Sequence, residues 1–215
     1  MRLLYRVSLV VASFLFLLAI GICGWFLLYT RDLPDFDHLS QFAPTAQSVT
    51  SDACLPGASI SIPFELMGKS FQDALSAAEP THLQADQIAR SLMCSHSGGM
   101  GKYHLNQLRL SWHIRRRFSQ REITTIYANR AYFGVGIVGI ENASQGFFRK
   151  EPEALSTEEA ALIAGLLHAP DYFSPRRHPE LALQRRNKVL EEMVAQGKLG
   201  AEEAGRLKAT PIITR

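Results

Sequence analysis

The sequence contains few cysteines, and they do not form a recognisable metal site. Of its 215 residues three are cysteines, and no cluster of Cys and His has the spacing of a zinc site. Cys23 falls in an apolar run, whereas Cys54 and Cys94 lie further along the chain. In an oxidising compartment these two could form a disulfide, and two free thiols are equally compatible with the sequence.

Period-two alternation of apolar and polar residues is scarce, and internal repeats are absent. The first absence argues against a mainly β fold, and the second argues against a repeat array. Apolar residues instead recur at helical spacing, so we predict a mainly α fold with one globular domain. A net charge of +3, from 23 Lys and Arg against 20 Asp and Glu, is too small to indicate nucleic-acid binding.

Charge is missing altogether from a long stretch near the N-terminus. Val7–Tyr29 is uncharged over 23 residues, and at 1.5 Å per residue it can span a hydrocarbon core of about 30 Å. A signal peptide would have a shorter apolar run and a small-residue cleavage site. A buried core helix is disfavoured because no polar face is present. We therefore expect an uncleaved transmembrane anchor.

The basic residues around this stretch predict its orientation. Arg2 and Arg6 precede it, whereas Arg31 follows it together with several acidic residues. Since Lys and Arg favour the cytoplasmic side, we expect a single-pass protein with its N-terminus in the cytoplasm. The C-terminal domain would then lie on the periplasmic or extracellular side of the membrane.

Composition divides the chain into three segments. Residues 1–29 would form a cytoplasmic stub and the anchor, and residues 30–56, with several Pro, Ser and Thr, would form a linker. Residues 57–215 would form one domain of ordinary size. Within it, S-x-x-E capping boxes at Ser119–Glu122 and Ser156–Glu159 predict the first residues of two helices.

Three blocks of sequence, in order, carry a resemblance to a known enzyme family. The longest, Phe118–Leu190, includes FSQREITTIYANRAYFG, VGIENASQGFF and LSTEEAALIAGLLHAPDYFSP. The others are QIARSL, Gln87–Leu92, and IPFELMGKSFQDALSAAE, Ile62–Glu79. Together they resemble the family 51 glycosyltransferases, the peptidoglycan polymerase domains that occur alone or in bifunctional penicillin-binding proteins.

The resemblance implies a mostly helical, lysozyme-like domain beside the bacterial plasma membrane, here in truncated form. Such domains polymerise lipid II, a disaccharide-pentapeptide on a polyprenyl diphosphate. A glutamate acts as base on the acceptor hydroxyl, which attacks the anomeric carbon of the donor with inversion. A sugar hydroxyl is a poor nucleophile and needs a positioned carboxylate. The leaving diphosphate needs basic residues, and often a divalent metal, where its charge develops.

The same resemblance assigns candidate site residues. Glu79 aligns with the first catalytic glutamate and is the candidate base, with a surface glutamate at a helix end as the alternative. Gln87, Arg90 and Asn129 are candidate substrate-binding residues, although for Asn129 the favoured role is to hold its helix against the following loop. A second family glutamate is replaced by Thr125, which cannot act as a base at pH 7.

Other family motifs are missing or changed. Pro80 replaces an aspartate, the H-x-G segment after it is absent, and Tyr103–Gln107 stands where R-K-x-x-E is expected. We therefore favour a weak or inactive relative that binds lipid-linked precursor, a glycan strand or a cell-wall synthase. The alternative is an active monofunctional transglycosylase with Glu79 as general base. No nucleotide is implied, because the glycines of G-x-G-x-x-G at Gly134 follow a helix and fit a turn.

One segment has no negative charge. Lys102–Arg121 contains six Lys and Arg residues and neither Asp nor Glu. Such a run often forms a solvated face. Near a membrane anchor it could instead attract anionic lipid headgroups or a lipid diphosphate.

Overall fold

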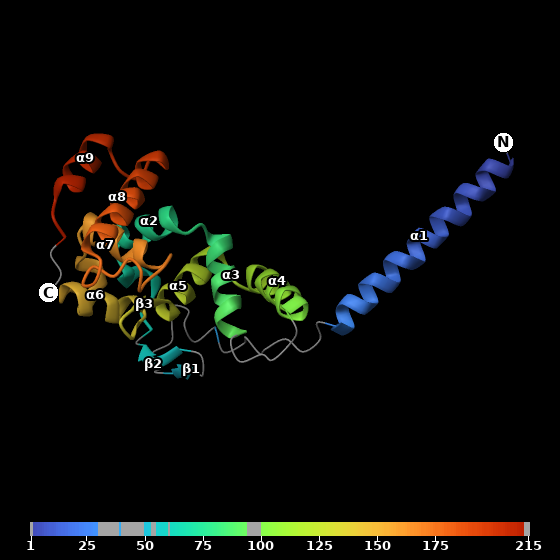
Figure 1. The fold of residues 1–215 in the computed structure, drawn as a ribbon, viewed down its shortest axis with the longest axis horizontal. Coiled ribbons are helices and arrows are strands. Elements are labelled where there is room, and N and C mark those ends of the chain that lie inside the picture. Colours follow the sequence, from blue (N-terminus) through green and yellow to red (C-terminus); the bar gives the residue numbers. More distant parts are fainter. Residues whose placement is uncertain are drawn as a thin grey trace.

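The computed structural model describes residues 2–29, 39, 50–52, 55–59, 61–93 and 100–212. Cys54 and Cys94 lie outside these residues, so both alternatives for this pair stay open. The described residues are mainly helical, which confirms the predicted class (Figure 1). After α1 the elements are β1 (Thr50–Asp52), β2 (Leu55–Ser59), η2 (Phe64–Met67), α2 (Lys69–Ala78), α3 (Thr81–Leu92), α4 (Met100–Arg117), α5 (Gln120–Arg130), β3 (Tyr132–Gly134), β4 (Ile137–Val138), α6 (Ile140–Phe148), η3 (Pro152–Ala154), α7 (Thr157–Leu166), α8 (Pro179–Ala195) and α9 (Ala201–Ala209).

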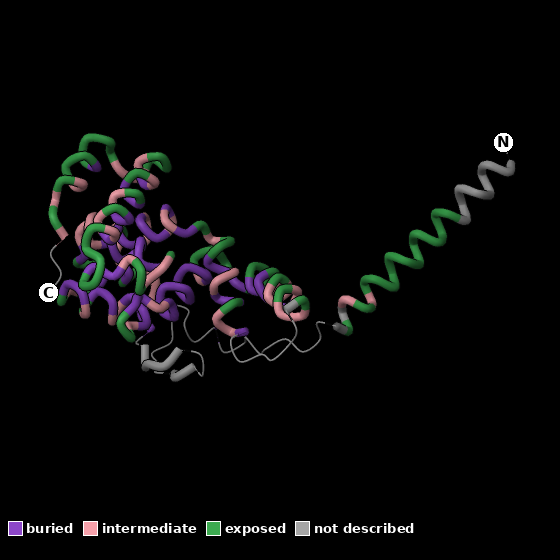
Figure 2. Tube along the Cα trace, in the orientation of Figure 1, coloured by how far each residue is buried: buried purple, intermediate pink, exposed green. Residues whose placement is uncertain are grey.

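Helix α1 (Arg2–Tyr29) contains the stretch that was predicted as an anchor. It is one helix of 28 residues, and most of its described positions from Val11 onward are exposed (Figure 2). Among its large apolar side chains, Phe14 and Phe16 are each 66% exposed. Among the described residues, no helix combines the length and the apolar character needed to cross a membrane. The anchor therefore stays a prediction.

Two short hairpins accompany the helices. β1 pairs antiparallel with β2, with Thr50 opposite Ser59, and β3 pairs antiparallel with β4, with Tyr132 opposite Val138. β1 and the first residues of β2 fall within residues 30–56, the segment predicted as a linker. The division of the chain into stub, linker and domain stays a prediction.

The core forms around α7, which packs against both α2 and α8 (Figures 1 and 2). Every residue of α7 from Ala160 to Leu166 is buried, because its small side chains let neighbouring helices approach closely. At Gly165 a Cβ would lie 3.0 Å from Cγ of Arg185 on α8. As predicted, α7 begins in a capping box, in which the Glu159 carboxylate accepts the Ser156 backbone N–H at 2.9 Å.

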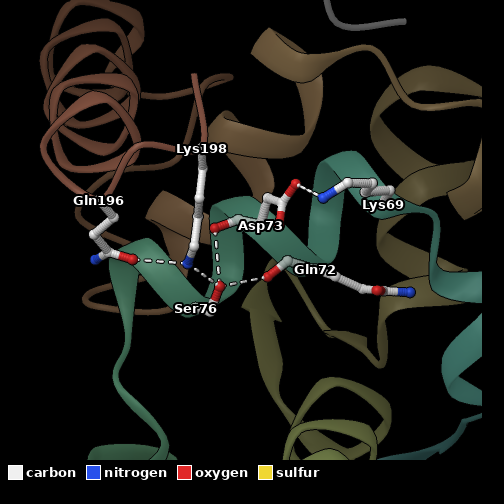
Figure 3. Close-up of polar contacts among 6 residues, drawn as sticks. All are labelled: Lys69, Gln72, Asp73, Ser76, Gln196 and Lys198. Carbon is white, nitrogen blue, oxygen red and sulfur yellow. Dashed lines mark hydrogen bonds and ion pairs between the residues drawn. The ribbon is translucent and has the colours of Figure 1, made fainter. Parts of the chain in front are cut away.

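A second contact fastens the turn after α8 to α2. The Lys198 ammonium donates to Ser76 Oγ at 2.5 Å and to Gln196 Oε1 at 2.7 Å (Figure 3). The Ser76 hydroxyl in turn donates to the Gln72 carbonyl at 2.8 Å. Since α2 ends shortly after Ser76, this contact helps to fix the position at which Glu79 leaves the helix.

Helix α3 lies between α4 and α5 and packs against both. The predicted capping box of α5 is present: Glu122 accepts the Ser119 backbone N–H at 2.7 Å, and the Glu122 N–H donates to Ser119 Oγ at 3.3 Å. Hydrogen bonds from Ser119 hold the pKa of Glu122 below its usual value. The capping of α5 therefore explains why a glutamate stands at position 122, without a catalytic role.

Replacing Ser119 with Ala should destabilise the domain by about 1 kcal/mol, since α5 loses a side-chain acceptor at its N-cap. Chemical denaturation of both variants would measure the change in the free energy of unfolding. Ser119→Gly is the matched control, because glycine is tolerated at N-caps and should cost only a few tenths of that unit. Equal losses for both substitutions would contradict a capping role.

Candidate functional site

A cavity of about 350 Å³ lies between α3, α5 and the loop that follows α7. Its polar lining side chains come from three separate parts of the sequence: Gln87, Arg90, Ser91, Tyr127, Arg130, Tyr132 and His168. None of the described lining residues carries a carboxylate. The cavity therefore offers hydrogen-bond donors and positive charge to whatever enters it.

Two of the predicted substrate-binding residues meet in this cavity. Gln87 and Arg90 are about one helical turn apart on α3 and both line it. Gln87 is half-buried and Arg90 is exposed. The structure thus brings these two candidates together at the site, one as an amide and the other as an exposed cation.

Arg130 is a functional candidate that the sequence interpretation missed. It ends α5, lines the cavity and is only 3% exposed. Its Nη2 lies 3.5 Å from Ser91 Oγ. Burial lowers the pKa of Arg130 to about 10, so the guanidinium is still charged at neutral pH. The sequence offered one sign of this role: Arg130 directly follows Tyr127-Ala128-Asn129 in the block that resembles the family.

Tyr127 joins the cavity to the candidate base. It is 6% exposed and contributes to the cavity wall. Burial and then the nearby charge of Glu79 raise the pKa of Tyr127 far above its usual range, with Arg90 acting in the opposite direction. The phenol therefore stays protonated and can donate a hydrogen bond to a bound ligand.

Glu79 lies at the end of α2, where its backbone N–H donates to the Leu75 carbonyl at 2.8 Å. The residue is 4% exposed, so the alternative of a surface glutamate is wrong. Its Oε1 lies 3.9 Å from Nδ1 of His168, which lines the cavity. Glu79 itself is not among the described lining residues. Its carboxylate lies behind the cavity wall, close to the lining residues His168 and Tyr127.

Burial raises the pKa of Glu79, and Glu192 adds to this rise, while His168 and Arg185 oppose it. The folded protein therefore keeps this proton at pH values where the unfolded chain has released it. The protonated Glu79 carboxyl thus contributes to the free energy of unfolding. This contribution is fully present below the ordinary pKa of 4.5 and is lost as the pH rises through the pKa of Glu79 in the folded protein. A carboxyl with this behaviour is suited to proton transfer with a bound hydroxyl.

Glu79→Gln should therefore make the protein more stable at neutral pH, by on the order of 1 kcal/mol, because no charge has to be buried. The gain should disappear below pH 4.5, where the wild-type carboxyl is protonated in both states. Urea unfolding across this pH range would measure it. A constant difference at all pH values would show that the substitution acts through packing and not through ionisation.

Gln84 positions the end of α2, a role that we did not predict from the sequence. It is fully buried. Its Nε2 donates to the Glu79 carbonyl at 2.7 Å, and its Oε1 accepts the Thr124 hydroxyl of α5 at 2.9 Å. This amide therefore links α2, α3 and α5 directly behind the candidate base.

Asn129 lies apart from the other predicted binding residues. It is fully buried and is not among the described residues that line the cavity. Its Nδ2 donates to the Ile62 carbonyl at 2.9 Å, and its Oδ1 accepts the Ile62 N–H at 3.2 Å. These contacts hold the segment before η2 against α5.

Thr125 and Asp86 are also engaged within the protein. Thr125, which the resemblance aligns with the second family glutamate, is fully buried and donates to the Arg121 carbonyl at 2.9 Å. Asp86 accepts a hydrogen bond from the Ser111 hydroxyl of α4 and does not appear in the described cavity wall. Neither residue supplies a carboxylate to the cavity.

A divalent metal, which the resemblance associates with this chemistry, does not fit the cavity lining. Magnesium and calcium prefer oxygen ligands, especially carboxylates, whereas this lining offers guanidinium, amide, hydroxyl and imidazole groups. Within the described part of the chain, no group of three or more His, Cys, Asp or Glu side chains is placed to hold a metal ion.

Comparison with known proteins identifies the family to which this chain belongs. Residues 85–194, which include all described lining residues of the cavity and all of α4, α5 and α7, match the family model described as Transglycosylase. The chain belongs to the transglycosylase family. Glu79 and the rest of α2 precede the matched range, so the match covers the cavity wall and not the candidate base.

Two transglycosylase-family relatives illustrate the extent of the similarity. Penicillin-binding protein 1A of Aquifex aeolicus is 38% identical over 117 residues, 54% of this chain and 16% of the relative. Penicillin-binding protein 1C of Escherichia coli is 43% identical over 115 residues, 54% of this chain and 14% of the relative. The chain thus spans only a small part of the length of these relatives.

A crystal structure of penicillin-binding protein 1A from Haemophilus influenzae has a similar fold. The similarity covers 74% of this chain and 18% of that protein, with a TM-score of 0.52 and 22% sequence identity. At this identity it supports the fold alone. It extends the similarity over more of the chain than the family model does.

Proposed function

We propose that this transglycosylase-family protein binds a lipid-linked glycan precursor, a disaccharide on a polyprenyl diphosphate, and polymerises it weakly or not at all. The observation that carries the proposal is the cavity wall itself. It combines the buried cation Arg130 with Arg90 and His168, and its described residues include no carboxylate.

A diphosphate fits this set of side chains. Guanidinium groups bind phosphate oxygens through parallel charge-assisted hydrogen bonds. Gln87, Ser91 and Tyr127 add neutral donors around the two arginines. An uncharged glycan would gain little from such a concentration of positive charge, so we favour the diphosphate-bearing precursor over a free glycan strand as the ligand.

Weak polymerisation is proposed because the candidate base is buried and the resemblance leaves the site without its second glutamate. Glu79 is 4% exposed and reaches the cavity only beside His168. Thr125 replaces the second glutamate expected from the family, and it is buried against Arg121. Groups that act as one catalytic unit do not lose activity independently, so several losses at one site favour binding without efficient turnover.

One observation favours the alternative, an active monofunctional transglycosylase. Glu79 has a raised pKa and lies 3.9 Å from His168, at the edge of the cavity. A carboxylate of raised basicity is a better acceptor for the proton of a sugar hydroxyl. In that case Glu79 would remove this proton while the arginines hold the leaving diphosphate.

The proposal includes a single-pass location in the bacterial plasma membrane, with the domain on the periplasmic or extracellular side. Its support is the uncharged stretch Val7–Tyr29 and the exposure of large apolar side chains in it, such as Phe14, Phe16 and Trp25. In spheroplasts, where added protease reaches the outer face of the plasma membrane, it should therefore digest the C-terminal domain. Full protection of that domain would contradict this orientation.

The proposal can be tested with the purified full chain and lipid II, with and without divalent metal. Binding should be detected by native mass spectrometry or fluorescence, while gels should show no glycan polymer above that of Glu79→Gln. Efficient polymerisation that depends on Glu79 would establish the alternative. Absence of any binding to the precursor would reject the proposed function.

A further inference from the structure

Helix α4 (Met100–Arg117) lies at the edge of the helical domain, where it packs against α3 and α5 (Figure 1). It carries five Lys and Arg residues over 18 positions and no acidic residue. One face is buried, with Leu110 and Ile114 fully inaccessible. The opposite face is open to the surroundings along most of the helix.

Two large apolar side chains interrupt this basic surface. Leu108 is 63% exposed and Trp112, one turn further, is 48% exposed. The guanidinium carbon of Arg116 lies 4.8 Å from the centre of the Trp112 ring, within cation–π range. Arg115, which is also exposed, comes nearly two turns after Leu108 on the same face. We call these four residues the α4 face.

The basic run recognised in the sequence is therefore not one uniform solvated surface. Arg121 turns away from α4, where it pairs with Glu65 and lies 4.6 Å from the centre of the Phe64 ring. The positive charge of Arg121 is therefore paired with a carboxylate within the domain. Arg115 and Arg116 instead flank exposed apolar side chains, an arrangement typical of surfaces that meet a membrane interface.

We propose that the α4 face docks onto the surface of an anionic phospholipid bilayer. Leu108 and the Trp112 ring would enter the boundary between headgroups and acyl chains, where indole rings are enriched. Arg115 and Arg116 would remain among the lipid phosphates, with their stems along the apolar surface. This inference does not rest on the proposed function, since it requires neither precursor binding nor catalysis.

Charge complementarity favours a bilayer over a second copy of the chain as the occupant. Two copies of α4 that met through this face would bring Arg115 and Arg116 of each close to those of the other, without a carboxylate on α4 to compensate. An anionic bilayer supplies the opposite charge and an apolar boundary at the same place. Docking would also bring α3, whose residues line the cavity, close to the membrane.

The chain contains two tryptophans, so Trp25→Phe makes Trp112 the single indole reporter. The full chain would be reconstituted into vesicles of phosphatidylcholine alone or mixed with phosphatidylglycerol, each with and without brominated acyl chains. We expect brominated lipids to quench Trp112 in the anionic vesicles, with quenching reduced in high salt and in pure phosphatidylcholine. Equal quenching in both compositions would overturn the proposal.

The arginines are tested in the same background. Arg115→Gln with Arg116→Gln should lower the ratio of docked to undocked protein by about tenfold or more, since each cation near an anionic surface favours binding severalfold. Arg177→Gln with Lys188→Gln, at exposed positions outside α4, is the matched control and should leave quenching unchanged. Equal losses in the two double variants would contradict docking through the α4 face.

Two further outcomes separate this proposal from its rivals. A Trp112 emission shift that depends on protein concentration and not on lipid charge would indicate a second copy on the α4 face and overturn the proposal. Arg130→Gln, which alters the cavity, should leave Trp112 quenching as it was. Failure of precursor binding with normal quenching would therefore reject the proposed function while supporting the docking surface.

Discussion

Replacing Arg130 with Gln is expected to weaken binding of a diphosphate-bearing precursor by about 10- to 100-fold, since hydrogen bonds to charged groups contribute roughly 1.5–3 kcal/mol. Arg130 is the most buried cation of the cavity wall, at 3% exposure, and burial lowers its pKa only to about 10. A charge held this way acts in a less polar environment than that of an exposed arginine. Isothermal titration of the full chain with the precursor would measure the loss.

Two matched variants make the Arg130 result interpretable. Arg130→Lys keeps the charge but removes the planar fork of donors, so it should lie between the wild type and Arg130→Gln. Arg177→Gln removes an exposed cation outside the cavity lining and should bind normally. Thermal unfolding of each variant would verify the fold. Normal binding by a folded Arg130→Gln protein would exclude the cavity as the diphosphate site.

Asn129→Ala is expected to destabilise the domain by roughly 2–4 kcal/mol, because two buried backbone groups lose their partner at once. The Asn129 amide pairs with both the N–H and the carbonyl of Ile62, 67 residues earlier in the chain. Alanine can replace neither contact, and it leaves a small void. Urea unfolding would measure the difference in the free energy of unfolding.

Asn142→Ala provides a comparison with the same change of side chain. Asn142 is half-buried and donates to the Val138 carbonyl at 2.8 Å, four residues away on the same local turn. Its loss should cost about 1 kcal/mol or less, as expected for one local hydrogen bond. If the two variants lost equal stability, the long-range role of Asn129 would be wrong. Preserved precursor binding by Asn129→Ala would further separate this residue from the cavity.

Local sequence patterns predicted much of the helical part of the fold. The S-x-x-E patterns singled out at Ser119 and Ser156 each mark a helix start in the structure, because a capping box involves residues only three apart. The family resemblance is confirmed by the match over residues 85–194. The transmembrane role of Val7–Tyr29 and the division into segments remain predictions.

The site was predicted less completely, and the reason lies in long-range contacts. Gln87 and Arg90 were identified, since they share one helix and one short motif. Gln84 was not, because its role depends on Thr124, 40 residues away, and on the end of α2. Arg130 was also missed, because a charged residue after a motif gives no local sign that the fold will bury it.

Residue identity and local spacing were enough to predict the mainly helical class and the family, and the resemblance aligns Thr125 with a family glutamate. Which polar residues face the cavity, which support the core and which are exposed became known from the three-dimensional packing. It placed Glu79 in a buried position beside His168, turned Asn129 toward Ile62, and left Trp112 exposed on α4. Burial arises from packing between segments distant in the sequence, so no local pattern specifies it.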